Sequence, residues 1–318
     1  TKTVTINPNN DEATIYYTID SSDPNDSETR QEYTEPFTLD RNLTIRVIAV
    51  QKEHFNSDLA ERVVTDFDNR FFAGDIRYRL VDNTVENEVE VTAKDDGYSG
   101  QITIPESVTY EGTTYKVTRI GNSAFYNCDG MTAINLPNTI TSIGNDAFNE
   151  CDGLTNIVLP GSVRTIGDKA FSYCRKLLSI TLPEGITSLG YRVFGYCSSL
   201  GAVSLPSTLE TIPENAFYYC TRLLSVKIPE SIKTIKNYAF FNCNILGSIV
   251  IPEGVTEIPY SCFDDCFELV SVTLPSTLIT IGTYAFNTCR SLTSIVIPAS
   301  VKNIYYGAFT ECDALNAV

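Results

Sequence analysis

Apolar residues recur with a period of 23 from residue 125 onward, and every period repeats the same order of residue types. In one period Ala147, Phe148, Cys151 and Leu154 are spaced like the inner side of a short helical turn. Alternating residues follow at 157–159 and end at a proline, which has no N–H to give to a neighbouring strand. Each period therefore predicts one short parallel strand, a turn, an irregular return and a helical turn.

A strict repeat of this length is typical of solenoids, in which each coil buries its apolar side against the next coil. We expect a mainly β protein with short helical turns. Its main part should be a right-handed solenoid of 23-residue coils, with the parallel strands forming a sheet on one face. A small antiparallel β-sandwich should precede it.

The chain divides into three expected parts. Residues 105–318 should form the solenoid, with about nine coils, the last incomplete, and the extra residues at 110–118 predict a hairpin. Residues 67–104 should form a β cap, because a terminal coil needs a polar cover over its apolar end. Residues 1–66 should form the sandwich, which is short enough to suggest a missing first strand. Its strands are expected at 15–19, 37–39 and 43–50.

Nine cysteines occupy the same inward position of successive coils. They are Cys128, Cys151, Cys174, Cys197, Cys220, Cys243, Cys266, Cys289 and Cys312. Nine thiols cannot all pair, and stacked side chains lie about 4.8 Å apart, beyond the ~3.8 Å between Cβ atoms of a disulfide. We expect a structural ladder of buried free thiols that act as small apolar fillers. Cys262 replaces the alanine of its coil and is expected to be a core substitution rather than a metal ligand.

The repeated unit, as in residues 143–160, reads Ile-Gly-x-x-Ala-Phe-x-x-Cys-x-x-Leu-x-x-Ile-x-Leu-Pro. It resembles the BspA-like class of bacterial leucine-rich repeats from about residue 70 to the end. Residues 98–105 resemble that family's junction between cap and repeats. The resemblance implies display on a bacterial surface and adhesion to host proteins or to other cells.

Residues 15–24, 33–37 and 45–50 resemble a small Ig-like module named after the carboxyl-terminal domain of chitobiase and β-hexosaminidase. Ser21 stands where that family usually has glycine. The resemblance implies an accessory or spacer module without catalytic residues.

Charge excludes two classes of partner. With 39 acidic and 23 basic residues, the formal charge is −16, so attraction to nucleic acid or to anionic lipid has the wrong sign. No apolar run is long enough for a transmembrane helix. The sequence begins at Thr1 without a recognisable leader, so an extracellular or cell-surface location is expected from the family resemblance alone.

The sequence offers few candidates for catalysis or for metal binding, and we expect neither an enzyme nor a cofactor. The single histidine, His54, has no evident nucleophile or orienting carboxylate and is expected in a surface loop. Residues 97–101 lack the second glycine of a nucleophile elbow. Asp20, Asp23 and Asp26 could bind calcium, although turn formation explains them more simply.

Two exposed surfaces are predicted. On the strand face, outward residues such as Thr155, Asn156 and Val158 are neutral, and Lys227 is the only charge in the complete coils; this face could receive a flat protein surface or have no role. On the opposite side, residues shortly before and after three of the cysteines in the sequence form a tyrosine–arginine patch. Its members are Tyr173, Arg175, Lys176, Arg192, Tyr196, Tyr218, Tyr219 and Arg222. Tyrosine and arginine dominate binding hot spots, but the rings could equally cover gaps between turns while the cations stay solvated.

Together these features favour a non-catalytic bacterial adhesion protein, displayed on the cell or secreted, that presents a rigid repeat surface to a protein of a host or neighbouring cell. The alternative is a glycan-binding or accessory component of a carbohydrate-utilisation system. It is suggested by the sandwich resemblance and by tyrosines that could stack on sugar rings.

Overall fold

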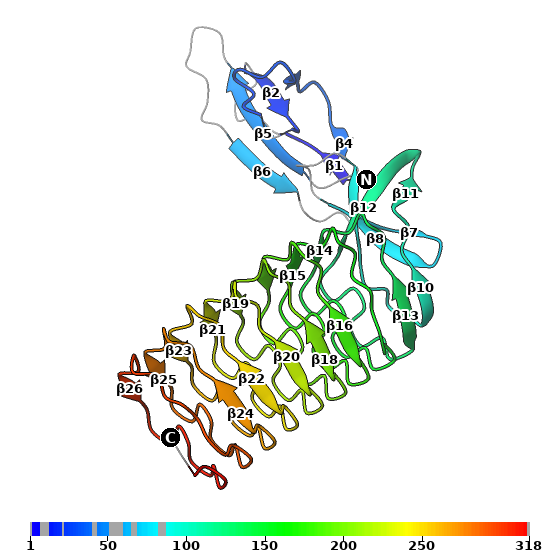
Figure 1. The fold of residues 1–318 in the computed structure, drawn as a ribbon. Helices are drawn as coiled ribbons and strands as arrows, with labels where there is room; N and C mark the ends of the chain where they lie inside the picture. Colours follow the sequence, from blue (N-terminus) through cyan, green and yellow to red (C-terminus); the bar gives the residue numbers. More distant parts are fainter. Residues whose placement is uncertain are drawn as a thin grey trace. The chain divides into compact units, whose positions relative to one another are not determined.

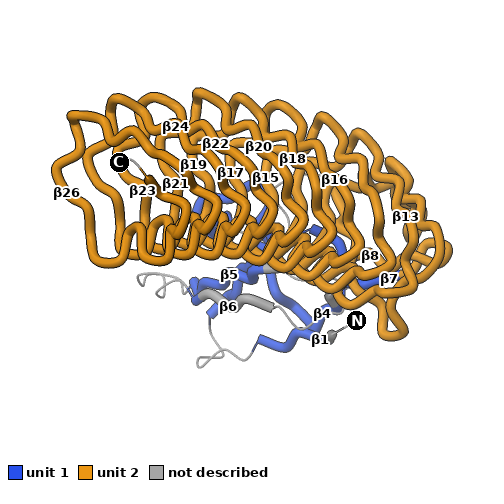
Figure 2. Tube along the Cα trace, turned by 60° about the horizontal axis from the view of Figure 1, so that its bottom comes forward, with its two compact units in different colours: residues 1–71, 79–87 blue, residues 72–78, 88–318 orange. Residues whose placement is uncertain are grey.

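The 23-residue periods form stacked coils in the computed structural model, which describes residues 2–6, 13–20, 22–39, 43–50, 60–64, 69–81 and 87–316. The chain divides into two compact units, drawn blue and orange in Figure 2. Unit 1 comprises residues 1–71 and 79–87, and unit 2 comprises residues 72–78 and 88–318.

One face of unit 2 carries the parallel strands that the alternating segments predict (Figure 1). The strands pair one coil apart in sequence, so that Ser179 lies opposite Ala202 and Ala202 opposite Ser225. They are β10 (Gly100–Thr103) with β13 (Met131–Asn135), β16 (Ser179–Thr181) with β18 (Ala202–Ser204) and β20 (Ser225–Lys227), and β22 (Ser248–Val250) with β24 (Ser271–Thr273). We call this surface the strand face. The mainly β, parallel solenoid is confirmed.

A second set of short parallel strands runs along the return path, where the sequence predicted irregular structure. One group is β12 (Thr113–Ile120), β14 (Ser142–Ile143), β15 (Thr165–Ile166) and β17 (Ser188–Leu189). The others are β19 (Thr211–Ile212) with β21 (Thr234–Ile235), and β23 (Glu257–Ile258) with β25 (Thr280–Ile281) and β26 (Asn303–Ile304). Each of these strands except β26 buries its isoleucine or leucine and exposes the preceding polar residue fully or in part.

The first coil ends in the predicted hairpin. β11 (Ser107–Tyr110) pairs antiparallel with β12, and the turn between them places Glu111 and Gly112 at positive φ. β9 (Glu88–Val91) pairs with the other edge of β12, and β8 (Ile76–Leu80) and β7 (Arg70–Ala73) follow in the same sheet. The Tyr98 ring lies 4.8 Å from that of Phe125, so Tyr98 covers the first phenylalanine of the repeat.

The core of unit 2 is a ladder of phenylalanines, one from each coil. From Phe125 to Phe309, neighbouring rings stack with centroids 5.2 to 5.8 Å apart. Beside it, the ladder thiols from Cys151 to Cys312 each donate to a phenylalanine carbonyl of the preceding coil; for example, the Cys220 Sγ lies 3.1 Å from the Phe194 oxygen. All ten cysteines are free thiols, and only Cys312 is partly exposed.

The segments before the cysteines are not the helical turns that the sequence predicted, since the described residues contain no helix. Two residues per coil, such as Asp146 and Glu150, have positive φ, and this unwinds the helical path. The amide groups then point along the solenoid: the N–H groups of Asp146, Phe148 and Glu150 donate to carbonyls of the next coil at 2.8 to 2.9 Å. These stacked turns form a third hydrogen-bonded side of the coil.

Unit 1 is antiparallel and contains the strands predicted from its alternating segments. One sheet has the order β3 (Gln31–Glu32), β2 (Thr14–Thr18), β5 (Leu43–Val50) and β6 (Ala60–Val64), and the other pairs β1 (Lys2–Val4) with β4 (Phe37–Leu39). Between them, the rings of Tyr17 and Phe37 stack at 4.4 Å beside buried Ile45.

The predicted polar turn follows β2. Asp20 accepts hydrogen bonds from the hydroxyls of Ser22 and Thr29, and these bonds lower the pKa of its carboxyl to about 2. The Asp23 carboxylate accepts from the Asn25 N–H at 2.9 Å. Both aspartates therefore serve turn formation. His54 lies outside the described residues.

Candidate functional site

The stacked turns present two columns of side chains on the surface of unit 2. Residues five and one before each cysteine have positive φ, as Arg192 (51°) and Tyr196 (63°) illustrate. The left-handed conformation turns these side chains outward, while the phenylalanine between them points into the core. Large side chains at these two positions, such as those of Tyr173, Arg192 and Tyr196, are partly exposed, whereas the smaller Asn215, Ser261 and Thr288 are buried there.

Four members of the tyrosine–arginine patch, Tyr173, Arg192, Tyr196 and Tyr219, lie on these columns. The rings of Tyr173 and Tyr196 stack at 4.4 Å with an interplanar angle of 5°, and Tyr219 stacks on Tyr196 at 5.1 Å. Tyr218 meets the edge of Tyr196 at 5.4 Å. All four rings are partly exposed. Both faces of Tyr196 are therefore covered by other tyrosines, and a binding partner reaches the ring edges and hydroxyls.

Arg192 lies at the centre of the patch. Its guanidinium carbon is 5.3 Å from the ring centre of Tyr191, 5.6 Å from that of Tyr196 and 5.3 Å from that of Tyr218. These distances are typical of cation–π contacts. Arg192 forms no ion pair within the described part of the chain, and its Nε is buried without a hydrogen-bond acceptor. The cation is held in place but is not neutralised.

Gly195 makes room for Arg192. A Cβ atom on Gly195 would lie 2.2 Å from the Arg192 Cγ, whereas the neighbouring coils carry a serine and Tyr218 at this position. This coil is the one that has glycine at this position, and the missing side chain lets Arg192 lie across the turn and reach the rings.

We therefore expect Gly195→Ala to move Arg192 out of the ring cluster. The NMR signals of the Arg192 Nε–H and of the Tyr218 ring protons should shift strongly, while stability changes by no more than about 1 kcal/mol, the size of one exposed cation–π contact. Gly201→Ala is the control, because its new Cβ would have no neighbour closer than 3.7 Å. Unchanged Arg192 signals in Gly195→Ala would contradict this geometry.

The outer cations are arranged differently. Arg175 lies over Tyr173 at 5.3 Å and pairs with Asp152 at 2.6 Å. Lys176 and Arg222 are exposed, and neither contacts a ring or a carboxylate among the described residues. The structure thus brings six of the eight predicted residues together and leaves Lys176 and Arg222 at the periphery.

The aromatic surface extends beyond the patch predicted from the sequence. A chain of edge-to-face contacts runs from Tyr218 through successive coils, and the ring centroids of consecutive members lie 5.1 to 6.2 Å apart. The further members are Tyr238, Tyr260, Tyr284 and Tyr306. A period of 23 residues does not identify these tyrosines, since the spacing between consecutive members from Tyr238 onward alternates between 22 and 24 residues. They occupy two adjacent positions in turn, and this alternation is the signal that could have revealed them.

The buried titratable groups of unit 2 favour their neutral forms. Burial raises the pKa of the Cys174, Cys197 and Cys220 thiols, which disfavours the reactive thiolate. Burial also raises the pKa of Asp264, although the Ser261 hydroxyl and the Asn287 amide donate to its carboxylate. Among the described residues, no three His, Cys, Asp or Glu side chains gather as metal ligands.

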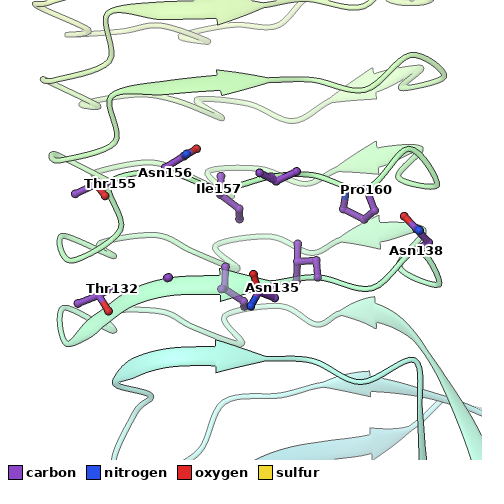
Figure 3. Close-up of a pocket in the computed structure, with 11 residues that line it drawn as sticks. Thr132, Asn135, Asn138, Thr155, Asn156, Ile157 and Pro160 are labelled. Carbon is purple, nitrogen blue, oxygen red and sulfur yellow. The ribbon is translucent and has the colours of Figure 1, made fainter.

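The strand face has a hollow of about 420 Å³ between β13 and the next coil (Figure 3). Here the ladder is interrupted, because β13 pairs with β10, and the next coil contributes only the bridge from Asn156 to Ser179. The lining is neutral: Figure 3 shows Thr132, Asn135 and Asn138 on one side and Asn156 on the other. The hollow can offer hydrogen bonds but no charge.

The repeat can now be compared with known families. A family model described as "BspA type Leucine rich repeat region (6 copies)" matches residues 118–246 and 210–318, which is more than half of the chain. The chain belongs to the BspA-type leucine-rich repeat family. A second model, "Fn3 associated", matches residues 4–64 and fits the Ig-like module predicted there. A search of curated proteins finds no significant match.

Several solved structures of leucine-rich repeat proteins are similar to this chain. A leucine-rich cell surface protein from Faecalibacterium prausnitzii is 26% identical, with a TM-score of 0.50, over 79% of this chain and 94% of that one. A leucine-rich repeat protein from T. pallidum is 27% identical, with a TM-score of 0.48, over 68% and 87%. One from Bacteroides ovatus is 24% identical, with a TM-score of 0.43, over 78% and 93%. No helix within the described ranges has the length and apolar content that a bilayer crossing requires.

Proposed function

We propose that this BspA-type protein is a non-catalytic adhesion protein, displayed on a bacterial cell surface or secreted, that binds a protein of a host or neighbouring cell through its tyrosine–arginine patch. Membership of a leucine-rich repeat family favours protein binding over catalysis. The similar F. prausnitzii protein is described as a cell surface protein, which supports the location.

The observation that carries the proposal is the backbone conformation of three stacked tyrosines. Tyr173, Tyr196 and Tyr219 have φ between 57° and 63°. A bulky residue in this region costs about 1–2 kcal/mol, and Asn127 and Asn242 show that other coils use a residue that tolerates it better. Tyrosine nevertheless occupies this position in three consecutive coils, which favours a binding role for the tyrosine side chains.

Electrostatics also favours a macromolecular partner at this surface. Arg192 and the peripheral cations Lys176 and Arg222 form no ion pairs within the described residues, although the whole chain carries a charge of −16. A partner with acidic groups could pair with these cations while it buries the tyrosine edges. The glycan alternative is not favoured here, because sugar rings bind to aromatic faces and both faces of Tyr196 are covered.

The test is an array of extracellular and cell-surface proteins, followed by affinity measurements on each protein that binds. We expect Tyr196→Ala to weaken binding at least about 30-fold, as for a hot-spot residue worth about 2 kcal/mol, and Arg192→Gln to act similarly. Ser204→Ala, on the strand face, is the matched control and should bind normally. Partners that lose affinity in Ser204→Ala but not in Tyr196→Ala would refute the patch as the binding site.

A further inference from the structure

A second hollow, of about 420 Å³, lies beside the tyrosine stack, on the side of the earlier coils. Its floor is formed by one column of left-handed residues, Ser123, Asp146, Lys169 and Arg192, which occupy the same position in four successive coils. Tyr126, Asn149, Glu150 and Tyr173 complete the lining. The hollow lies at the coil that carries Asn149 and Glu150, where the preceding coil has Tyr126 in place of Asn149 and the following coil has Tyr173 in place of Glu150.

Tyr126 differs from the stacked tyrosines. Its side chain is 47% exposed, and its hydroxyl lies 3.3 Å from the Glu150 carboxylate, to which it donates. Its ring contacts no other ring among the described residues, whereas both faces of Tyr196 are covered. Tyr126 therefore offers an open aromatic face at the edge of the hollow.

The hollow combines unpaired donors with unpaired acceptors. Lys169 forms no ion pair within the described part of the chain, and the Nε of Arg192 lacks an acceptor. The Asn149 amide donates to Asp146 at 2.7 Å, but Asn149 is only 6% exposed and its Oδ1 receives no hydrogen bond. The Oδ1 atom itself has almost no accessible surface, so a ligand hydroxyl reaches it only with a shift of the Asn149 side chain. A buried acceptor without a donor costs about 1–3 kcal/mol, which favours that contact.

We infer that this hollow binds a hydroxyl-rich acid, in chemical terms an acidic sugar at the end of a glycan. The carboxylate of the sugar pairs with Lys169 and Arg192, its hydroxyls donate to Asp146 and Asn149, and its C–H face packs on Tyr126. A neutral sugar would leave both cations unpaired. A protein carboxylate would leave the acceptors unpaired, whereas the sugar supplies hydroxyl donors together with its carboxylate. The hollow shares Tyr173 and Arg192 with the tyrosine–arginine patch, whereas Tyr126 and Lys169 belong to the hollow alone.

The experiment is ligand-observed saturation-transfer NMR with methyl β-glucuronide, and with methyl β-glucoside, which has a CH₂OH group in place of the carboxylate. We expect the glucuronide to bind with a dissociation constant on the order of 1 mM and the glucoside at least tenfold more weakly. Lys169→Gln and Tyr126→Ala should each reduce glucuronide binding about tenfold. Lys227→Gln on the strand face and Tyr305→Ala, exposed residues outside the hollow and the patch, are the matched controls.

Three results would overturn the inference: equal binding of the two glycosides, glucuronide binding unchanged in Lys169→Gln and Tyr126→Ala, or no glucuronide binding at 10 mM, about ten times the expected constant. Binding of a free amino acid such as alanine in place of the glucuronide would assign the mixed charges to a zwitterion instead. Binding of free glucuronic acid but not of its methyl glycoside would identify a free acid rather than a glycan end. Neither Tyr126 nor Lys169 belongs to the tyrosine–arginine patch, so failure here leaves the protein-binding proposal standing.

Discussion

Raising the pH from 8 to 10 is expected to unfold the solenoid, because the folded state keeps its thiols protonated and the unfolded state does not. Burial raises the pKa of the fully buried thiols, among them Cys174, Cys197 and Cys243, well above the usual value. In the unfolded chain each thiol loses its proton near pH 8.5. Above that pH the unfolded state binds fewer protons than the folded state, so the free energy of unfolding falls as pH rises.

The magnitude makes this the dominant pH effect. Each thiol that stays protonated only in the folded state lowers the free energy of unfolding by about 1.36 kcal/mol per pH unit, or roughly 2 kcal/mol at pH 10. Domains are stable by only about 5–15 kcal/mol, so a few such thiols are sufficient. Cys220, Cys262 and Cys266 are also completely inaccessible. We therefore expect loss of structure between about pH 9 and 10.5.

Far-UV circular dichroism with a reducing agent present, together with urea unfolding at each pH, measures this effect. Tyrosines should contribute only above about pH 10, where an unfolded tyrosine loses its proton, because burial and the hydrogen bond with Tyr260 raise the pKa of Tyr238 in the folded state to about 12. Cys220→Ala is the control variant: it starts less stable at pH 7 but should lose stability less steeply above pH 8.5, by about 1.36 kcal/mol per pH unit. A free energy of unfolding that is the same at pH 7 and pH 10 would show that the thiols are not protected by folding.

The coil could be predicted from the sequence because its core positions are fixed by one period. Ala147, Phe148, Cys151 and Leu154 are all inaccessible, as their spacing indicated. The same spacing suggested a helical turn, and this was wrong. A helix satisfies its amides internally, whereas the N–H of Phe148 donates to Ala170 of the next coil. Hydrophobic spacing identifies the buried side but does not identify the hydrogen-bond partners.

The candidate site was only partly predictable, for the same reason. Tyr173, Tyr196 and Tyr219 repeat at one position and could be found by period alone. Whether their rings stack or point apart depends on the left-handed backbone, and the space for Arg192 depends on Gly195, which the period does not single out. Surface side chains vary freely on a fixed core, so their arrangement requires coordinates.

The phenylalanine ladder leads to the second large expected effect. Phe217 stacks on Phe194 at 5.6 Å and on Phe240 at 5.2 Å, and it has no exposed surface. Phe217→Ala should therefore destabilise the solenoid by about 3–5 kcal/mol, which combines lost apolar burial with the cavity that remains. Val296→Ala is the control: this side chain is 82% exposed, so its loss should cost no more than about 0.5 kcal/mol.

In a repeat array the position of this loss matters as much as its size. Stability is approximately a sum over coils and over the interfaces between neighbouring coils, and Phe217→Ala weakens two adjacent interfaces at once. Hydrogen exchange measured at increasing urea concentration should show the amide hydrogens of β18 and β20 exchanging early, while those of the coils on either side remain protected. If all coils instead lose protection together, the solenoid unfolds as one cooperative unit, and the stacked phenylalanines do not set the boundaries of local unfolding.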